Sequence, residues 1–404
     1  MPWKESTPMD ERLRFVQDVH RPGWSIAELC RRYDVSRKTG YKWLAAYARA
    51  GPAALADVSH RPNTCPHATP PKVVQLILQL QRRYTWGARK VRRLLLDRVP
   101  ADEVPTKTTV HRILERHGRV QPRRRSRRRF HQGPPQTPMD QPNAVWTTDF
   151  KGQFRTGNGV YCYPLTVQDG ATRFLLSCRG LLDPTTAASQ PVFARLFQRY
   201  GLPARIRSDN GSPFASNAMG RLSTLSVWWV RLGICPELLA PAHPEQNGHH
   251  ERMHKTLKAA TARPPQPDAA AQQRCFDAFR RRYNTVRPHE ALGDATPASG
   301  YAASPRPYPS TLAPLEYPGH YERRLVSRNG GIRWNREWVN VSHLLAELEI
   351  GLEEIDDGLW NVYFGPVWLG RFHEAVGRII DQLNRPARRR GGNHLEARNV
   401  LPIT

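Results

Sequence analysis

Three acidic residues lie in sequence contexts that suit metal-dependent chemistry. Asp149 lies in the strand-like stretch WTTDF, Asp209 ends the strand-like IRSD before an Asn-Gly turn, and Glu251 begins a helical stretch. Carboxylates on neighbouring strand ends and one helix can converge, but their mutual repulsion is costly unless cations neutralise it. Carboxylate oxygens suit Mg²⁺ or Mn²⁺. Two such ions, roughly 3.5–4 Å apart, would hold the attacking and leaving oxygens of an in-line phosphoryl transfer.

Each acid also has an ordinary structural explanation when it is taken singly. An Asp before Asn-Gly is commonly a turn residue. Asp149 alone is compatible with a solvent-facing strand position, and Glu251 with Lys255 forms a common i,i+4 helix pair. The occurrence of all three acids in this order on a strongly basic chain favours the catalytic interpretation.

The helical stretch around Glu251 contains a competing motif. Residues 250–254, HERMH, fit the pattern H-E-x-x-H. On a helix, two such histidines bind Zn²⁺ and the Glu acts as the general base of a metalloprotease. Short patterns match by chance, and the basic KTLK that follows suits phosphates better than a peptide pocket. Contact with DNA and packing of the helix are the other interpretations of His254.

The pattern of strand-like and helical stretches in residues 143–300 predicts a mixed α/β sheet that would position the acids. An Asp169-Gly170 hairpin signal separates two strand-like runs. A helix that ends at Gly201 follows, then a short strand that leads into Asp209, and then mostly helices.

Residues 1–60 predict a helix-turn-helix domain. Ser25 and Glu28 form a capping box, and a short break precedes a second helix. The start of this second helix would enter a DNA groove and carries Ser36, Arg37, Lys38 and Lys42. The alternative is an ordinary helical hairpin with a solvated basic face.

Residues 61–120 predict a second helix-turn-helix-like domain, with two amphipathic stretches and a third helix after Pro105. Residues 121–142 follow as a basic, Pro-rich linker. Six arginines there suit contact with the DNA backbone: Arg123, Arg124, Arg125, Arg127, Arg128 and Arg129. Beyond the α/β region we expect a linker, a small β-barrel-like domain and a basic tail, at residues 301–320, 321–380 and 381–404.

The overall charge favours a nucleic-acid partner. The 404 residues include 61 Lys and Arg against 35 Asp and Glu, a formal net charge of +26. Six cysteines without a CxxC pair argue against a zinc ribbon and against a disulfide framework. The sequence has neither a secretory signal pattern nor an apolar run that could span a membrane. We therefore expect a reduced, cytoplasmic protein that binds DNA or RNA and no membrane.

The order WTTDF, IRSDNGSPF, HPEQNGHHERMHKTLK and YNTVRPHEAL resembles the catalytic core of bacterial insertion-sequence DDE transposases, which is similar to retroviral integrase. The resemblance is strong over about residues 140–300 and looser elsewhere. It implies an RNase H-like integrase core between N-terminal all-α helix-turn-helix units and a small C-terminal β-rich domain. It also implies a catalytic, metal-binding triad of Asp149, Asp209 and Glu251.

The third acid has two candidates. The strict spacing of the family would select Glu245, whereas Glu251 lies six residues later. We favour Glu251 because the preceding Gln-Asn-Gly matches the family and because Glu245 is expected in a loop. Lys255 and Lys258 lie four and seven residues after Glu251, on the same helical face.

The resemblance implies an enzyme that binds the terminal inverted repeats of an insertion sequence, cleaves the 3′ ends and joins them to target DNA. It implies two Mg²⁺ or Mn²⁺ ions and a homodimer or larger assembly on DNA. Asn247, Lys255 and Lys258 would contact DNA beside the acids, and Arg287 and His289 either contact DNA or pack against the core. A DNA-binding regulator without catalysis is the second interpretation, and the presence of all three acids argues against it.

Overall fold

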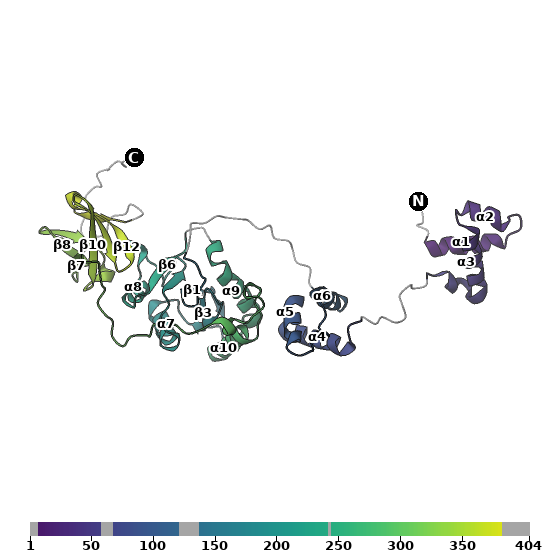
Figure 1. The fold of residues 1–404 in the computed structure, drawn as a ribbon, viewed down its shortest axis with the longest axis horizontal. Coiled ribbons are helices and arrows are strands. Elements are labelled where there is room, and N and C mark those ends of the chain that lie inside the picture. The colour runs from purple at the N-terminus through teal and green to yellow at the C-terminus, as the bar shows by residue number, and fades with distance from the viewer. Residues whose placement is uncertain (1–6, 58–67, 121–136, 241–243, 382–404) are drawn as a thin grey trace. The chain divides into compact units, whose positions relative to one another are not determined.

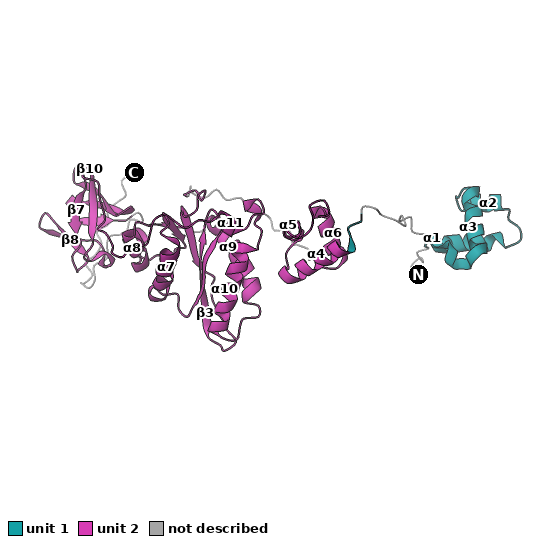
Figure 2. Cartoon of the chain, turned by 60° about the horizontal axis from the view of Figure 1, so that its bottom comes forward, with its two compact units in different colours: residues 1–71 teal, residues 72–404 magenta. Residues whose placement is uncertain are grey.

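The computed structural model divides into two compact units, residues 1–71 and 72–404 (Figure 2). Within them the structure describes residues 7–57, 68–120, 137–240 and 244–381. None of the helices in these ranges has both the length and the apolar character needed to cross a membrane.

The first unit is a small helical domain (Figure 1) that consists of α1 (Pro8–Val19), α2 (Ile26–Arg32), α3 (Arg37–Ala50) and the 3-10 helix η1 (Gly51–Leu55). The expected capping box is present, since Ser25 Oγ accepts from the Glu28 N–H and the Glu28 carboxylate accepts from the Ser25 N–H. Between α2 and α3, Asp34 adopts a left-handed φ of 49°, which Asp tolerates. Gly40 allows close approach, because a Cβ there would lie 2.7 Å from Cys30 Sγ. The helix-turn-helix prediction is confirmed.

A second helical bundle comprises α4 (Pro71–Tyr84), α5 (Ala88–Leu96) and α6 (Lys107–Arg116). Its apolar stripes meet in one core that includes Ile77, Val91 and Val110. Thr106 caps α6 by accepting a hydrogen bond from the Thr109 N–H. The helices expected in this part of the chain are therefore present.

The central domain is built on a mixed six-stranded sheet. Its strands are β1 (Val145–Phe150), β2 (Phe154–Arg155), β3 (Tyr161–Asp169), β4 (Leu175–Leu181), β5 (Arg205–Ser208) and β6 (Cys235–Leu238). The strand order is β2-β3-β1-β5-β6, and β4 pairs with β3. The β1–β5 and β5–β6 pairs are parallel and the others antiparallel. The sheet confirms the expected α/β core.

The expected hairpin joins β3 to β4, and the buried Asp169 carboxylate holds it. This carboxylate accepts hydrogen bonds from the Asn143 N–H at 2.7 Å and from the Thr172 N–H and hydroxyl at 2.8 and 2.6 Å. Asp169 therefore has a structural function, because its carboxylate satisfies the hydrogen-bond donors of the backbone around the turn.

Helices cover both faces of the sheet. They are α7 (Thr186–Tyr200), α8 (Thr224–Arg231), α9 (Gly248–Thr261), α10 (Ala269–Thr285) and the short α11 (Pro297–Gly300). Consecutive strand residues point to opposite faces. Trp146 packs with Phe193 of α7 and Trp229 of α8, whereas Leu175 packs with Phe276 of α10. Figure 2 shows α7 and α10 on opposite sides of the sheet.

The C-terminal region is a β-rich layer that confirms the expected class. A five-stranded antiparallel sheet has the order β13-β12-β11-β10-β7, and a two-stranded ladder pairs β8 with β9. The strands are β7 (Glu322–Leu325), β8 (Gly331–Trp334), β9 (Glu337–Asn340), β10 (Glu349–Asp356), β11 (Leu359–Phe364), β12 (Val367–His373) and β13 (Arg378–Ile380).

Short 3-10 helices complete the second unit, namely η2 (Met219–Arg221), η3 (Pro244–Asn247), η4 (Glu290–Leu292), η5 (His343–Leu345) and η6 (Glu374–Val376). The C-terminal sheet shares one apolar core with η2 and α8, in which Met219 and Val230 pack with Ile350 and Phe364. The Pro-rich segment before β7 also packs on the central domain. Its Arg306 donates hydrogen bonds to the carbonyls of residues 203, 232 and 233.

Candidate active site

The two aspartates lie at the ends of adjacent parallel strands. Asp149 is in β1, and Asp209 directly follows β5. The two strands pair from Val145 with Arg205 to Thr147 with Arg207. If this register is extended by two residues, Asp149 is level with Asp209. Residues at the same level of parallel strands point to the same face of a sheet, so both carboxylates lie on one side.

Burial and like charge make both carboxylates unusual acids. Burial raises the pKa of Asp149 to about 7, the negative charges of Asp209 and Glu251 act in the same direction, and Lys151 opposes them. Burial also raises the pKa of Asp209, while its hydrogen bond from the Gly211 N–H opposes the shift. Among the described residues, neither aspartate has a Lys or Arg within ion-pair distance. The site thus carries negative charge without a matching side-chain cation.

Glu251 lies in the first turn of α9 and is exposed. Its negative charge acts to raise the pKa of Asp149. The start of α9 lies against β1, because the neighbouring His250 contacts the Thr147 hydroxyl. Lys255 and Lys258 are also exposed on α9, as the helical spacing requires. The expectation that Glu245 lies in a loop is wrong, because η3 contains it. The backbone at Glu245 is therefore ordered by a 3-10 turn that leads directly into α9.

His250 and His254 connect α9 to the sheet beneath it. His250 is fully buried, with Nδ1 at 2.9 Å from the Thr147 hydroxyl and Nε2 at 2.7 Å from the Thr166 hydroxyl. His254 Nε2 also lies 2.7 Å from the Thr166 hydroxyl. Burial lowers the pKa of His250 to about 3 and that of His254 to about 2. Both imidazoles are therefore neutral, and they act as hydrogen-bonding braces.

The protons in this network can be assigned from its geometry. Thr166 Oγ1 is also 3.0 Å from the Asp149 carbonyl oxygen, to which it donates its only proton. Both histidines must then donate Nε2–H to Thr166. The Thr147 hydroxyl donates to His250 Nδ1, which lies 2.9 Å away, in preference to the Gln168 carbonyl oxygen at 3.3 Å. The remaining lone pair, on His254 Nδ1, faces Asp149 Oδ2 at 3.6 Å. This arrangement suits a protonated Asp149 carboxyl in the metal-free protein.

The zinc-protease interpretation of HERMH conflicts with this geometry. Both ring nitrogens of His250 are engaged by threonine hydroxyls inside the protein, so neither is available as a ligand. Glu251 is exposed, whereas His250 and His254 are buried. The HERMH motif therefore belongs to a helix whose two histidines are buried and whose glutamate is exposed.

The donor set of the acidic site fits a hard divalent cation. Its ligands would be carboxylate oxygens, which Mg²⁺ and Mn²⁺ prefer. Desolvated carboxylates without a paired cation are stabilised when a divalent ion binds them. Within the described ranges, the side chains bring no group of three His, Cys, Asp or Glu close enough to hold a metal together. The two level aspartates thus supply the kind of oxygen ligand that such an ion prefers.

The other predicted DNA-contact residues occupy several parts of the chain. Ser36 is the N-cap of α3, and its neighbours Arg37, Lys38 and Lys42 are exposed along that helix. Asn247 precedes α9 and is buried, with an Oδ1 that has no hydrogen-bond partner among the described residues. The arginines of residues 123–129 lie outside the described residues.

Sequence reasoning missed the partners of the two histidines, Thr147 and Thr166. Both threonines are buried on the α9 side of β1 and β3. The alternating strand pattern marked their neighbours as apolar, but no motif connected them to residues 250 and 254. The only available signal was that two histidines one helical turn apart face inward together.

Family models match both the central domain and the N-terminal helices. Models described as integrase core domain match residues 139–244 and 232–297. Models described as helix-turn-helix domain and homeodomain-like domain match residues 11–63 and 39–114.

Two curated relatives come from bacterial insertion elements. An uncharacterized 39.2 kDa protein of insertion element IS476 from Xanthomonas euvesicatoria is 27% identical over 269 residues, 65% of this chain and 73% of the relative. An uncharacterized 31.7 kDa protein of insertion element IS407 from Burkholderia multivorans is 29% identical over 170 residues, 41% of this chain and 57% of the relative. The chain is a DDE transposase with an integrase core. Its helix-turn-helix and integrase domains make it a DNA-binding enzyme.

A solved structure with a similar core is the HTLV-2 integrase catalytic core domain in complex with magnesium. The match covers 40% of the transposase and 97% of the HTLV-2 chain, at 15% identity and a TM-score of 0.32.

Proposed function

We propose that this transposase binds the terminal inverted repeats of its insertion sequence, cleaves their 3′ ends and joins the freed 3′ hydroxyls to target DNA. The observation that supports the proposal most is the level placement of Asp149 and Asp209 on adjacent parallel strands, beside the start of the helix that carries Glu251. The desolvation that raises the pKa of both aspartates adds to this support, because such a site favours divalent cations.

Asp149, Asp209 and Glu251 would hold two Mg²⁺ or Mn²⁺ ions. The exposed Glu251 side chain has no interaction that fixes it within the described residues, so it is free to turn toward the aspartates. Bound metal would lower the pKa of the attacking water or hydroxyl and offset the charge that develops on the phosphate. Lys255 and Lys258, on the same face of α9, would orient the DNA backbone, and the histidine–threonine braces would hold α9 against β1.

The helix-turn-helix units would provide sequence recognition. The exposed start of α3, with Ser36, Arg37 and Lys38, suits insertion into a major groove. The Arg-rich segment at residues 123–129 would add sequence-independent affinity for phosphates. Cleavage of both ends of one element requires two active sites, so we include a homodimer or larger assembly on DNA in the proposal.

A cleavage and strand-transfer assay tests the proposal. Labelled duplexes that carry the ends of the encoding element are incubated with the full chain and Mg²⁺ or Mn²⁺. We expect 3′-end cleavage and joining by the wild type. Asp149→Asn, Asp209→Asn and Glu251→Gln should each lower the rate by about 100-fold or more and leave DNA binding intact. Asp183→Asn, at an exposed position after β4, is the matched control and should retain full activity.

Two outcomes would contradict parts of this proposal. Loss of activity in Glu245→Gln together with normal activity in Glu251→Gln would assign the third acid to Glu245. Tight end binding by the wild type without cleavage in either metal would remove the catalytic mechanism and favour the regulatory interpretation.

A further inference from the structure

A groove of about 550 Å³ lies where the α4–α5 loop meets α9 and α10. All of these elements belong to the second compact unit. The size is sufficient for a ligand as large as a nucleotide, since small-molecule sites begin at roughly 300 Å³. The question is which chemistry its walls select.

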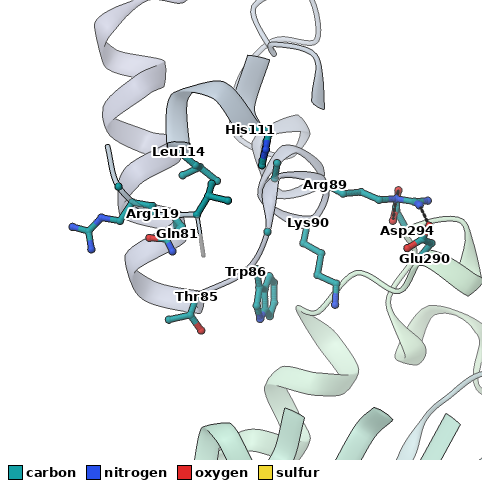
Figure 3. Close-up of a pocket in the computed structure, with 14 residues that line it drawn as sticks. Gln81, Thr85, Trp86, Arg89, Lys90, His111, Leu114, Arg119, Glu290 and Asp294 are labelled. Atoms are coloured by element: carbon teal, nitrogen blue, oxygen red, sulfur yellow. Dashed lines mark hydrogen bonds and ion pairs between the residues drawn. The ribbon is translucent and has the colours of Figure 1, made fainter. Parts of the chain in front are cut away.

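The walls of the groove are cationic, and no acidic residue lines it. Its charged lining residues are Arg83, Lys90, Lys255, Arg282 and Arg287. The two nearby carboxylates are already engaged, because Arg89 forms ion pairs with Glu290 and Asp294. Figure 3 shows Arg89 directed at these carboxylates, while Lys90 extends beside Trp86. The positive charge of the groove therefore remains available for an anion.

Two further observations indicate that the cations are crowded. Burial and the charge of Arg287 lower the pKa of Lys90 to about 8. Arg287 Nε is buried and has no hydrogen-bond partner among the described residues. A bound phosphate would offset the repulsion and accept the unused hydrogen bond.

The groove also has an aromatic wall. Tyr84 and Trp86 stack with ring centroids 4.6 Å apart and an interplanar angle of 22°. Arg287 and Lys90 lie 5.5 and 5.8 Å from the Trp86 ring centroid. Thr85, between the two aromatic residues, has a φ of 53°, which is costly for a β-branched residue and is typical of functional loops. Stacked rings surrounded by cations are the usual surface for single-stranded nucleic acid.

The groove adjoins the acidic site along α9. Lys255 lines the groove and lies one helical turn after Glu251, on the same helical face. A strand with one phosphate at the acids would therefore pass Lys255 and reach the aromatic wall with a neighbouring nucleotide.

We propose that this groove binds an unpaired nucleotide of the DNA strand that is being processed, with its base on the Tyr84–Trp86 stack and its phosphate at Lys90, Arg287 and Lys255. The processed strand is identified by the proposed function, whereas the groove's preference for an unpaired base can be measured without cleavage. Duplex phosphate contacts alone would not use the aromatic wall.

The experiment uses the full chain with Asp149→Asn, so that DNA is not cut, and two duplexes of the same sequence. One duplex has a blunt end, and the other has a three-nucleotide unpaired end. Both contain 2-aminopurine as a fluorescent base at the corresponding position of the end. We expect the unpaired end to bind about 10-fold more tightly and its fluorescence to be quenched by stacking. Trp86→Leu should abolish both effects, and Trp86→Phe should retain most of them. Lys90→Gln should lower the salt dependence of binding by about one phosphate contact.

The matched controls are Trp338→Ala, at an exposed tryptophan of β9, and Lys72→Gln, at an exposed lysine of α4. Neither should change the preference for the unpaired end, the quenching or the salt dependence of binding. Equal binding and quenching for the blunt and unpaired ends would overturn the proposal. A preference that persists in Trp86→Leu would overturn it as well. A third outcome separates the two proposals. If the wild type does not cleave DNA with Mg²⁺ but its preference for the unpaired end still depends on Trp86, the catalytic proposal is wrong and the nucleotide-binding groove is supported.

Discussion

His250 explains how the backbone that carries the exposed Glu251 is held against the sheet. It directly precedes Glu251, and its ring bridges the hydroxyls of Thr147 in β1 and Thr166 in β3. The orientation of the first turn of α9 thus depends on a buried polar network. In such a network, removal of one partner is costly because it leaves the others without hydrogen bonds.

We expect His250→Ala to lower the free energy of unfolding by about 3 kcal/mol, because it leaves a cavity and two buried hydroxyls with fewer partners. Urea denaturation measures this cost. His249→Ala is the control, because His249 is exposed and its bond to Arg173 is at the surface, so a change under about 0.5 kcal/mol is expected. Equal costs for the two variants would contradict the bracing function of His250.

The raised pKa of Asp149 predicts a pH dependence of stability in the metal-free protein. An unfolded Asp loses its proton near pH 4, whereas the folded residue keeps it up to about pH 7. Between these values the folded state binds more protons, so its stability falls as pH rises. Relative to Asp149→Asn, the free energy of unfolding of the wild type should fall by up to about 4 kcal/mol between pH 4 and pH 7 and stay constant above that range.

Urea denaturation in EDTA at a series of pH values measures the difference in the free energy of unfolding between the wild type and Asp149→Asn. The titration of the other groups largely cancels in this difference. A difference that stays constant with pH would show that Asp149 has an ordinary pKa. Addition of Mg²⁺ at alkaline pH should stabilise the wild type and leave Asp149→Asn nearly unchanged, since the ion neutralises the ionised carboxylate.

At the scale of elements, the β5–β6 pair is fixed by a buried ion pair beside the site. Arg207, two residues before Asp209, has a side chain that is 2% exposed and binds Glu237 of β6 at 2.8 Å. It also donates to the Thr137 carbonyl oxygen at 2.9 Å. This pair therefore anchors the end of β5 from which Asp209 extends.

Arg207→Met should lower the free energy of unfolding by about 3–5 kcal/mol, because it leaves the Glu237 carboxylate without its partner in a poorly solvated position. The double variant Arg207→Met, Glu237→Leu should recover part of this loss, since no buried charge remains without a partner. Thermal or urea unfolding of both variants tests the argument. A double variant as unstable as the single one would indicate that packing, not charge, determines the cost.

At the scale of the whole molecule, the formal net charge of +26 sets how the transposase meets DNA. Positive side chains release counterions from the duplex, so affinity falls steeply as salt rises. The six arginines of residues 123–129 are the densest such run in the chain.

Replacement of these six arginines by glutamine should lower the slope of log K against log salt by about 5, because each phosphate contact contributes about 0.9. Binding of a random duplex across a salt series measures this slope. Arg328→Gln is the control and should leave the slope unchanged, because Arg328 lies in a turn of the C-terminal region and is paired with Glu347. An unchanged slope in the six-residue variant would show that this segment makes no phosphate contacts.

Much of the local structure could be predicted from the sequence. The capping box at Ser25, the strand that directly precedes Asp209 and the helix that is capped by Gly201 all follow from short-range rules of hydrogen bonding and backbone conformation. These rules act within a few residues, so a short window of sequence contains them. Each motif of the integrase-like core is likewise a short stretch of sequence, so the motifs and their order could be recognised without the structure.

The tertiary structure alone decided which side chains share an environment. The register of β1 with β5 sets Asp149 level with Asp209, and the burial of α9 turns the histidines of HERMH into braces for Thr147 and Thr166. The pairing of Tyr84 and Trp86 with Arg287, about two hundred residues away along the chain, has no local signal at all. Register, burial and desolvation arise from contacts between distant segments, and those contacts determine the pKa of a carboxylate or the function of a histidine.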